Sequence, residues 1–185
     1  MKQDTAIKRL CETALFTALV FLGIFIFKFP LPFGYVHLGD SMIFLAVLML
    51  GGKRGAFAGG IGGALADLIS GYAIWMFPTF LCKFFLALCM GYVIEKQLFG
   101  LVGKRAWVVG GLLGGLVQTI GYMIASYVLY GMPAVIVAIP SLAFQSIAGL
   151  VVAFILAAAL QKTALQKYFK PLPSKEIEPQ VSDAL

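Results

Sequence analysis

The stretch Tyr35-Val36-His37-Leu38-Gly39-Asp40 is a polar interruption in a chain that is otherwise apolar enough to lie in lipid. It contains the only histidine of the sequence, and Asp40 is one of two carboxylates inside the apolar region, with Asp67. A charged side chain at membrane depth is costly, so it normally faces protein or water and marks a functional site. We therefore expect Asp40, Asp67 and Lys83 to lie together at the mouth of a small-molecule pocket.

The rest of the chain sets the class of protein. Of its 185 residues, 61% are hydrophobic, and its mean hydropathy is +0.97, whereas a soluble domain is about half apolar. The apolar residues also form long runs, which predicts an all-α integral membrane protein with a single domain over residues 1–170. The charged, proline-bearing residues 171–185 are predicted to form a flexible cytoplasmic tail.

Six segments are candidates for membrane-spanning helices, each of which needs about 20 mostly apolar residues. The second is short and must tilt, begin earlier or be partly re-entrant. The predicted outer loops are residues 29–37, 72–76 and 131–139. The six segments are residues 8–27, 38–50, 54–71, 77–98, 105–130 and 140–161.

The distribution of basic residues predicts the orientation of these helices. With the N-terminus in the cytoplasm, twelve of the fourteen Lys and Arg residues fall on the inner side, and only Lys28 and Lys83 do not. Cytoplasmic loops are enriched in Lys and Arg. We therefore predict six transmembrane helices with both termini cytoplasmic.

The small and polar residues of the last four segments recur at steps of four, a spacing that lets helix backbones approach closely in lipid. The polar members, among them Gln118, Tyr122 and Gln145, fall in the middle or outer half of the membrane, and the inner half is glycine, alanine and aliphatic residues. This asymmetry predicts a polar cup that opens outward above a dry floor. A continuous ion path would need polar residues through the inner half as well.

The polar residues of the cup allow structural interpretations beside ligand binding. Asp67 and Lys83 are candidates for a buried ion pair, and Asp40 is a candidate N-cap of the second helix. His37 is a candidate interface residue bonded to the backbone. The aromatic residues Tyr72, Trp75 and Phe77 fit either an interfacial belt or a lid that stacks on a flat heteroaromatic ligand.

Several motifs are missing. Residues 51–54, Gly-Gly-Lys-Arg, lack the spacing and the hydroxyl of a phosphate-binding loop, so the chain is not expected to hydrolyse ATP itself. There is no HExxH motif or Cys/His cluster to predict a metal site, and no nucleophile with a nearby base to predict a catalytic residue. The basic pI does not predict nucleic-acid binding, because no basic helix stands clear of the membrane.

The order of the motifs at residues 35–40, 51–55 and 59–67, followed by Lys83, resembles the substrate-binding S component of energy-coupling factor (ECF) transporters. These proteins are vitamin-uptake members of the ABC importers, and the resemblance covers about residues 8–165. The branch most similar is associated with hydroxymethylpyrimidine, the thiamine precursor, or with pyridoxine. The resemblance implies a multi-pass protein of a prokaryotic plasma membrane, without a cofactor, that delivers its vitamin to a T subunit and two ATPase subunits, which use the ATP.

The resemblance and the predicted depth of the polar residues in the membrane together predict a set of substrate contacts. Only Asp40, Asp67 and Lys83 among them lie at motif positions. It also predicts that Ala14 and Ala18 contact the T subunit, because they match the family's Ala-xxx-Ala pattern. Cys11-Glu12-Thr13 stands where some members have Ala-Arg-Asn. The predicted substrate contacts are His37, Asp40, Asp67, Tyr72, Trp75, Lys83, Gln118, Tyr122 and Gln145.

Two other classes of function are kept open. In the first, the chain is an integral-membrane enzyme that acts on a lipid, with His37 and Asp40 as acid and base. This hypothesis predicts turnover by the isolated chain. In the second, the chain is a small channel, and conductance without ATP would distinguish it from a transport subunit.

Overall fold

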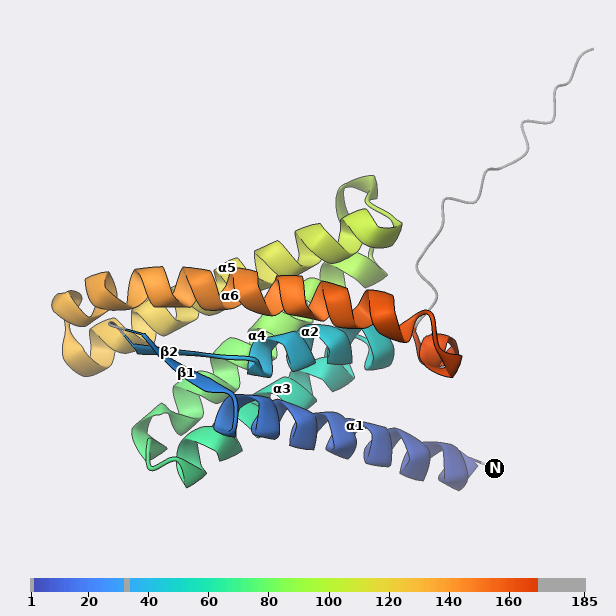
Figure 1. Ribbon diagram of the computed structural model, residues 1–185, viewed down its shortest axis with the longest axis horizontal. Coiled ribbons are helices and arrows are strands. Elements are labelled where there is room, and N and C mark those ends of the chain that lie inside the picture. The colour runs from blue at the N-terminus through green and yellow to red at the C-terminus, as the bar shows by residue number, and fades with distance from the viewer. Residues whose placement is uncertain (1, 32–33, 170–185) are drawn as a thin grey trace, which may run out of the picture.

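Six α-helices make up the body of the computed structural model, which describes residues 2–31 and 34–169 (Figure 1). They confirm the predicted helical class. The predicted tail, residues 171–185, lies outside the described residues. The helices are α1 (Lys2–Phe25), α2 (Gly39–Leu50), α3 (Gly52–Ile69), α4 (Met76–Glu95), α5 (Gly103–Tyr130) and α6 (Met132–Leu160).

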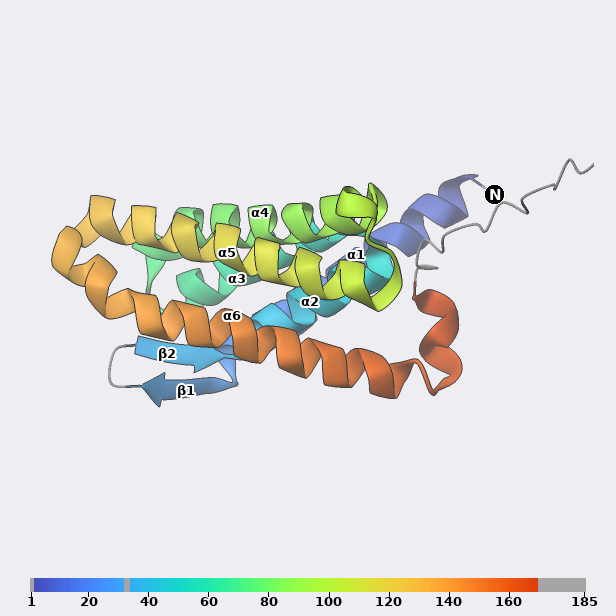
Figure 2. The ribbon, with the colours of Figure 1, turned by 90° about the horizontal axis from the view of Figure 1, so that it is seen from above.

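A short antiparallel hairpin lies between α1 and α2, where the sequence predicts a loop. Its strands are β1 (Lys28–Leu31) and β2 (Gly34–His37), with Lys28 opposite His37. Both strands of a two-stranded ribbon are edges, and an edge strand tolerates a proline such as Pro30. The hairpin lies beside α6 (Figure 2) and brings His37 to the start of α2.

Helix α2 is short and is surrounded by protein. Its 12 residues span roughly 18 Å, less than the hydrocarbon thickness of about 30 Å. Ten of them are buried, and α2 packs against α1, α3, α4 and α6. The predicted short second segment is confirmed, and its position explains how a helix of this length is accommodated.

The connection between α5 and α6 differs from the prediction. A loop was expected over residues 131–139, but Gly131 alone separates the two helices, with φ +80°. Glycine adopts this left-handed conformation without steric cost. Pro133 lies in the first turn of α6, where no backbone hydrogen bond is lost, and Pro140 lies inside the helix rather than at its start.

Small residues allow the helices to cross closely, as the four-residue spacing predicted. Gly91 of α4 lies against Gly52 at the start of α3, so that a Cβ atom at Gly91 would overlap the Gly52 backbone. A Cβ atom at Gly149 of α6 would lie 2.9 Å from the Cβ of Asp40 in α2. These contacts bring polar side chains of different helices within hydrogen-bond distance of one another.

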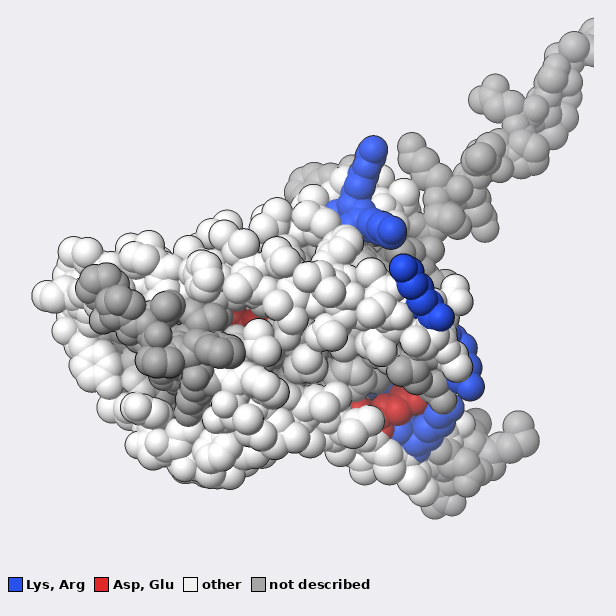
Figure 3. Space-filling view, in the orientation of Figure 1, with Lys and Arg blue, Asp and Glu red and all other residues white. Residues whose placement is uncertain are grey.

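The two ends of the molecule differ in charge. On the face shown in Figure 3, the Lys and Arg side chains gather at the end that holds the N-terminus of α1. Among the described residues, three helical stretches are long and apolar enough to cross a membrane: Ala73–Glu95, Gly103–Tyr130 and Met132–Leu160. The first of these joins η1, a 3-10 turn over Ala73–Trp75, to α4.

Candidate ligand-binding site

A pocket of about 260 Å³ lies where α3 and α5 end and where α4 and α6 begin. Lys53, Lys96 and Lys104 lie near the opposite ends of α3, α4 and α5. The pocket is thus separated along the helix axes from the basic end of the molecule. Its lining residues are Ile24, His37, Asp67, Tyr72, Trp75, Thr79, Lys83, Tyr122, Ser126, Ala138, Ser141, Leu142 and Gln145.

Asp40 lies behind this pocket at the centre of a buried polar cluster. Its side chain is 0% exposed, and its Oδ1 accepts a hydrogen bond from Lys83 Nζ at 2.7 Å. Its Oδ2 accepts hydrogen bonds from Gln118 Nε2 at 2.7 Å and from Gln145 Nε2 at 2.9 Å. A buried carboxylate is tolerated when an opposite charge and hydrogen-bond donors replace water, and this cluster supplies both.

The polar cluster corrects two of the structural interpretations. Lys83 forms its ion pair with Asp40 and not with Asp67, because α4 presents Lys83 to the first turn of α2. Asp40 does not cap α2, because its carboxylate faces three donors from other helices. Such pairings depend on how the helices are rotated against one another, which the sequence pattern does not reveal.

His37 is hydrogen-bonded to the backbone, as one of its two interpretations predicted, and it also lies at the pocket. Its Nδ1 accepts a hydrogen bond from the Gly39 backbone N–H at 3.2 Å, and its ring lines the pocket. An imidazole nitrogen that accepts a hydrogen bond carries no proton. In the neutral ring the proton then lies on Nε2.

Aromatic side chains form one wall of the pocket. The ring centroid of Trp75 is 6.1 Å from that of Tyr122 and 5.9 Å from that of Tyr130. The Tyr122 hydroxyl donates a hydrogen bond to Thr79 Oγ1 at 3.1 Å, and Lys83 Nζ lies 5.9 Å from the Tyr122 ring centroid. This last distance is within the range of a cation–π contact.

The pocket brings together seven of the nine predicted substrate contacts. The other two, Asp40 and Gln118, are buried behind it and do not line it. Binding of a substrate by any of the nine remains a prediction. Ala14 and Ala18, the predicted partner contacts, are both exposed on α1.

Six lining residues were not predicted. Thr79, Ser126 and Ser141 lie on the four-residue rows of small and polar residues, so their spacing was a signal that the prediction did not use. Ile24, Ala138 and Leu142 carry no such signal, because apolar pocket walls look like ordinary helix-packing residues in a sequence.

Known proteins resemble this chain over most of its length. The model of a family described as "ECF-type riboflavin transporter, S component" matches residues 4–162. The thiamine precursor transporter HmpT of Lactococcus lactis subsp. cremoris is 31% identical over 167 residues, which cover 89% of this chain and 94% of HmpT.

Two further similarities extend this comparison. An uncharacterized protein of Pyrococcus woesei, described by its position in the gap 3′ region, is 33% identical over 127 residues, which cover 68% of this chain and 82% of that protein. A solved structure, described as the S component of a bacterial ECF transporter, superposes with a TM-score of 0.70 at 27% sequence identity. The superposition covers 85% of this chain and 97% of the other.

Proposed function

The chain belongs to the S components of ECF-type transporters, and from that premise we propose that it captures a small heterocyclic vitamin or vitamin precursor from outside the cell. Hydroxymethylpyrimidine or pyridoxine is the favoured ligand. The loaded chain docks through Ala14 and Ala18 on a T subunit, and two ATPase subunits supply the energy for release inside. The family is one of transporter subunits and not of enzymes.

The observation that carries this proposal is the pocket with Asp40 behind it. The volume of about 260 Å³ lies just below the range of roughly 300–1,000 Å³ that is usual for small-molecule sites. A ligand with one aromatic ring suits this space better than a three-ring flavin with its ribityl chain. The similarity to a thiamine precursor transporter supports the same choice.

The lining groups complement a substituted pyrimidine or pyridine. Trp75 and Tyr122 offer aromatic faces for a flat ring. The Asp67 carboxylate and Gln145 Oε1 are acceptors suited to an exocyclic amine, and the ammonium group of Lys83 is a donor suited to a ring nitrogen or a hydroxyl group. Pockets of this kind are mainly apolar and aromatic, with a few polar groups that orient the ligand.

Asp40 has a positioning role in this proposal. It holds Lys83 through one carboxylate oxygen and Gln145 through the other. Both of these side chains therefore keep their orientation before the ligand arrives. Preorganised contacts lose less conformational entropy on binding, which favours high affinity.

The enzyme hypothesis has less support from this geometry. An acid–base pair of His37 and Asp40 would require both groups to reach the substrate. Asp40 is 0% exposed and both of its oxygens accept hydrogen bonds inside the protein, whereas only His37 lines the pocket.

The first test is ligand identification on the isolated chain. We would purify the chain in detergent, identify bound small molecules by mass spectrometry, and measure thermal unfolding with hydroxymethylpyrimidine, thiamine, pyridoxine, riboflavin and folate. A ligand that binds the native state raises its stability, so we expect a pyrimidine or pyridine vitamin to raise the Tm. If the purified chain carries no bound small molecule and no vitamin raises its Tm, the proposal is contradicted.

Docking is tested separately from binding. Replacing Ala14 and Ala18 with Trp would place bulky side chains on the exposed face of α1. We expect vitamin uptake by cells that contain the T and ATPase subunits to be lost, and vitamin binding by the isolated double variant to be unchanged. Normal uptake by this variant would exclude these two residues from the docking surface.

A further inference from the structure

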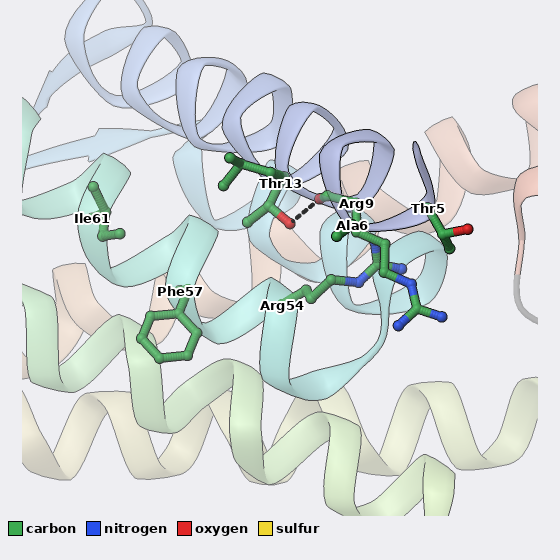
Figure 4. A pocket seen from close by; sticks show the side chains of 8 residues that line it. Thr5, Ala6, Arg9, Thr13, Arg54, Phe57 and Ile61 are labelled. Carbon is green, nitrogen blue, oxygen red and sulfur yellow. Dashed lines mark hydrogen bonds between the residues drawn. The ribbon is translucent and has the colours of Figure 1, made fainter. Parts of the chain in front are cut away.

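A second cavity, separate from the candidate ligand site, lies between α1 and α3 at the basic end of the molecule (Figure 4). Its volume is about 860 Å³. Nothing in the proposed capture of a vitamin uses this space. Its lining residues are Thr5, Ala6, Arg9, Leu10, Thr13, Arg54, Phe57 and Ile61.

The cavity changes from charged to apolar along the helix axes. Figure 4 shows Arg9 of α1 and Arg54 of α3 reaching the same end of it, with Phe57 and Ile61 further along α3. Phe57 and Ile61 are 52% and 41% exposed, and they lie roughly 4.5 and 10.5 Å from Arg54 along the axis. A cationic end beside the basic face of the molecule is therefore continuous with an apolar wall that extends toward its middle.

The two guanidinium groups differ in their contacts with other residues. Arg54 is held in place, because its Nη1 pairs with Glu12 Oε2 at 2.8 Å and its Nε donates to the Leu50 carbonyl at 3.1 Å. Within the described part of the chain, Arg9 makes no ion pair. Arg9, Arg54 and Glu12 together carry one net positive charge, and a guanidinium group suits the bidentate recognition of phosphate.

We propose that this cavity binds an anionic phospholipid, with its phosphate and headgroup at Arg9 and Arg54 and an acyl chain along Phe57 and Ile61. A phospholipid is complementary to this cavity. Its anionic group lies at the membrane surface, where the cavity is cationic, and its hydrocarbon chain lies below, where the cavity is apolar. Juxtamembrane Lys and Arg residues attract anionic lipids. The proposal requires only that the basic end lies at a membrane surface, and it does not depend on which vitamin is bound.

The test compares two lipids with identical acyl chains on the full chain in detergent. Thermal unfolding is followed during titration with dioleoylphosphatidylglycerol, which is anionic, and with dioleoylphosphatidylcholine, which is zwitterionic. We expect a saturable rise in Tm with the first lipid alone. In Arg9→Gln we expect the apparent Kd for dioleoylphosphatidylglycerol to rise about tenfold, because one charge-assisted hydrogen bond is lost.

The matched control is Arg105→Gln, which removes an exposed arginine at the start of α5 and should keep the apparent Kd of the native chain. A second variant, Ala6→Trp, places a bulky side chain in the cavity without changing its charge and should also abolish the response to phosphatidylglycerol. Both cavity variants should still bind the vitamin, so that loss of the lipid site is distinguishable from failure of the proposed function.

Four outcomes would overturn the proposal. Equal responses to the two lipids would show that charge is not recognised, and equal losses in Arg9→Gln and Arg105→Gln would show that the effect is not local. An equal response to inorganic phosphate would assign the site to a free anion. If phosphatidylglycerol has no effect and Arg9→Gln instead fails to assemble with the T subunit, the cavity is a protein-docking surface.

Discussion

At the scale of single residues, Asp40 connects the buried structure of this protein to its candidate site. Its carboxylate, 0% exposed, accepts hydrogen bonds from residues of α4, α5 and α6. Removing one partner from a buried ion pair leaves the other charge without compensation, which is more costly than removing both. Asp40 and Lys83 are therefore expected to depend on each other for stability.

This dependence gives the first prediction. Asp40→Asn or Lys83→Met alone should lower the free energy of unfolding by about 3–5 kcal/mol, because each leaves one charge buried without its partner. The double variant should lose clearly less than the sum of the two single losses. Thermal or denaturant unfolding of the four proteins in detergent measures the coupling, and additive losses would contradict it.

A second prediction at this scale concerns Trp75, which lines the pocket beside Tyr122 and Tyr130. Trp75→Leu should raise the Kd for the vitamin about tenfold, because the loss of an aromatic contact costs roughly 1 kcal/mol in addition to the lost area. The Tm without ligand should change little.

The control for Trp75→Leu is Phe77→Leu, which changes a nearby aromatic residue that is 66% exposed and does not line the pocket. Its vitamin affinity should equal that of the native chain. If both variants bind the vitamin normally, the aromatic residues of this region belong to the membrane interface and not to the ligand site.

At the scale of elements, the crossing of α2 and α6 holds the polar cluster together. Gly149 of α6 lies against Asp40 in the first turn of α2, and Gln145, one helical turn earlier in α6, donates to the same carboxylate. The absence of a side chain at Gly149 lets the two backbones approach. The short helix α2 thus meets a long helix at the position where its buried charge needs a donor.

This crossing gives the third prediction. In Gly149→Ala, the added Cβ atom would lie 2.9 Å from the Asp40 Cβ and 3.4 Å from the Ser41 backbone N. The helices must then move apart, which weakens the bond from Gln145 to Asp40. We expect a lower Tm and a several-fold weaker vitamin affinity, both measured by thermal-shift titration.

Ala158→Val is the control for this substitution, because it adds volume at an exposed position of the same helix. It should change neither the Tm nor the vitamin affinity. An affinity in Gly149→Ala equal to that of the control would mean that the α2–α6 distance does not determine the geometry of the pocket.

At the scale of the whole molecule, the two ends are specialised. The polar pocket lies at one end of the bundle, and on the face shown in Figure 3 the Lys and Arg side chains gather at the other. Charged residues near the membrane surface orient a polytopic protein, with Lys and Arg on the cytoplasmic side. The arrangement is consistent with a pocket that is loaded from outside.

The fourth prediction tests this orientation. In intact cells, a membrane-impermeant maleimide should label Met132→Cys, which is exposed at the start of α6. Arg105→Cys and the native, exposed Cys11 should be labelled only after permeabilisation, because they lie toward the basic end. The opposite pattern would place the pocket on the cytoplasmic side and would contradict capture from outside.

Local sequence patterns were enough to predict the class of protein, the approximate helices and the residue types of the candidate site. Hydropathy and the four-residue spacing are local properties, so α2, α3 and α4 were placed to within a few residues, and seven of the predicted contacts line one pocket. Each residue of a helix adds the same rise along its axis. The sequence position of a polar residue therefore predicts its depth, and residues of similar depth could be assigned to one site.

Which of these groups contact one another depends on the packing of the helices. The partners of Asp40 are 43, 78 and 105 residues away in the sequence, and their pairing depends on how each helix is rotated and how closely it crosses its neighbours. The same holds for Arg9 and Arg54, which share a cavity because α1 packs on α3. Rotation and crossing result from the packing of all six helices together, and no local pattern contains them.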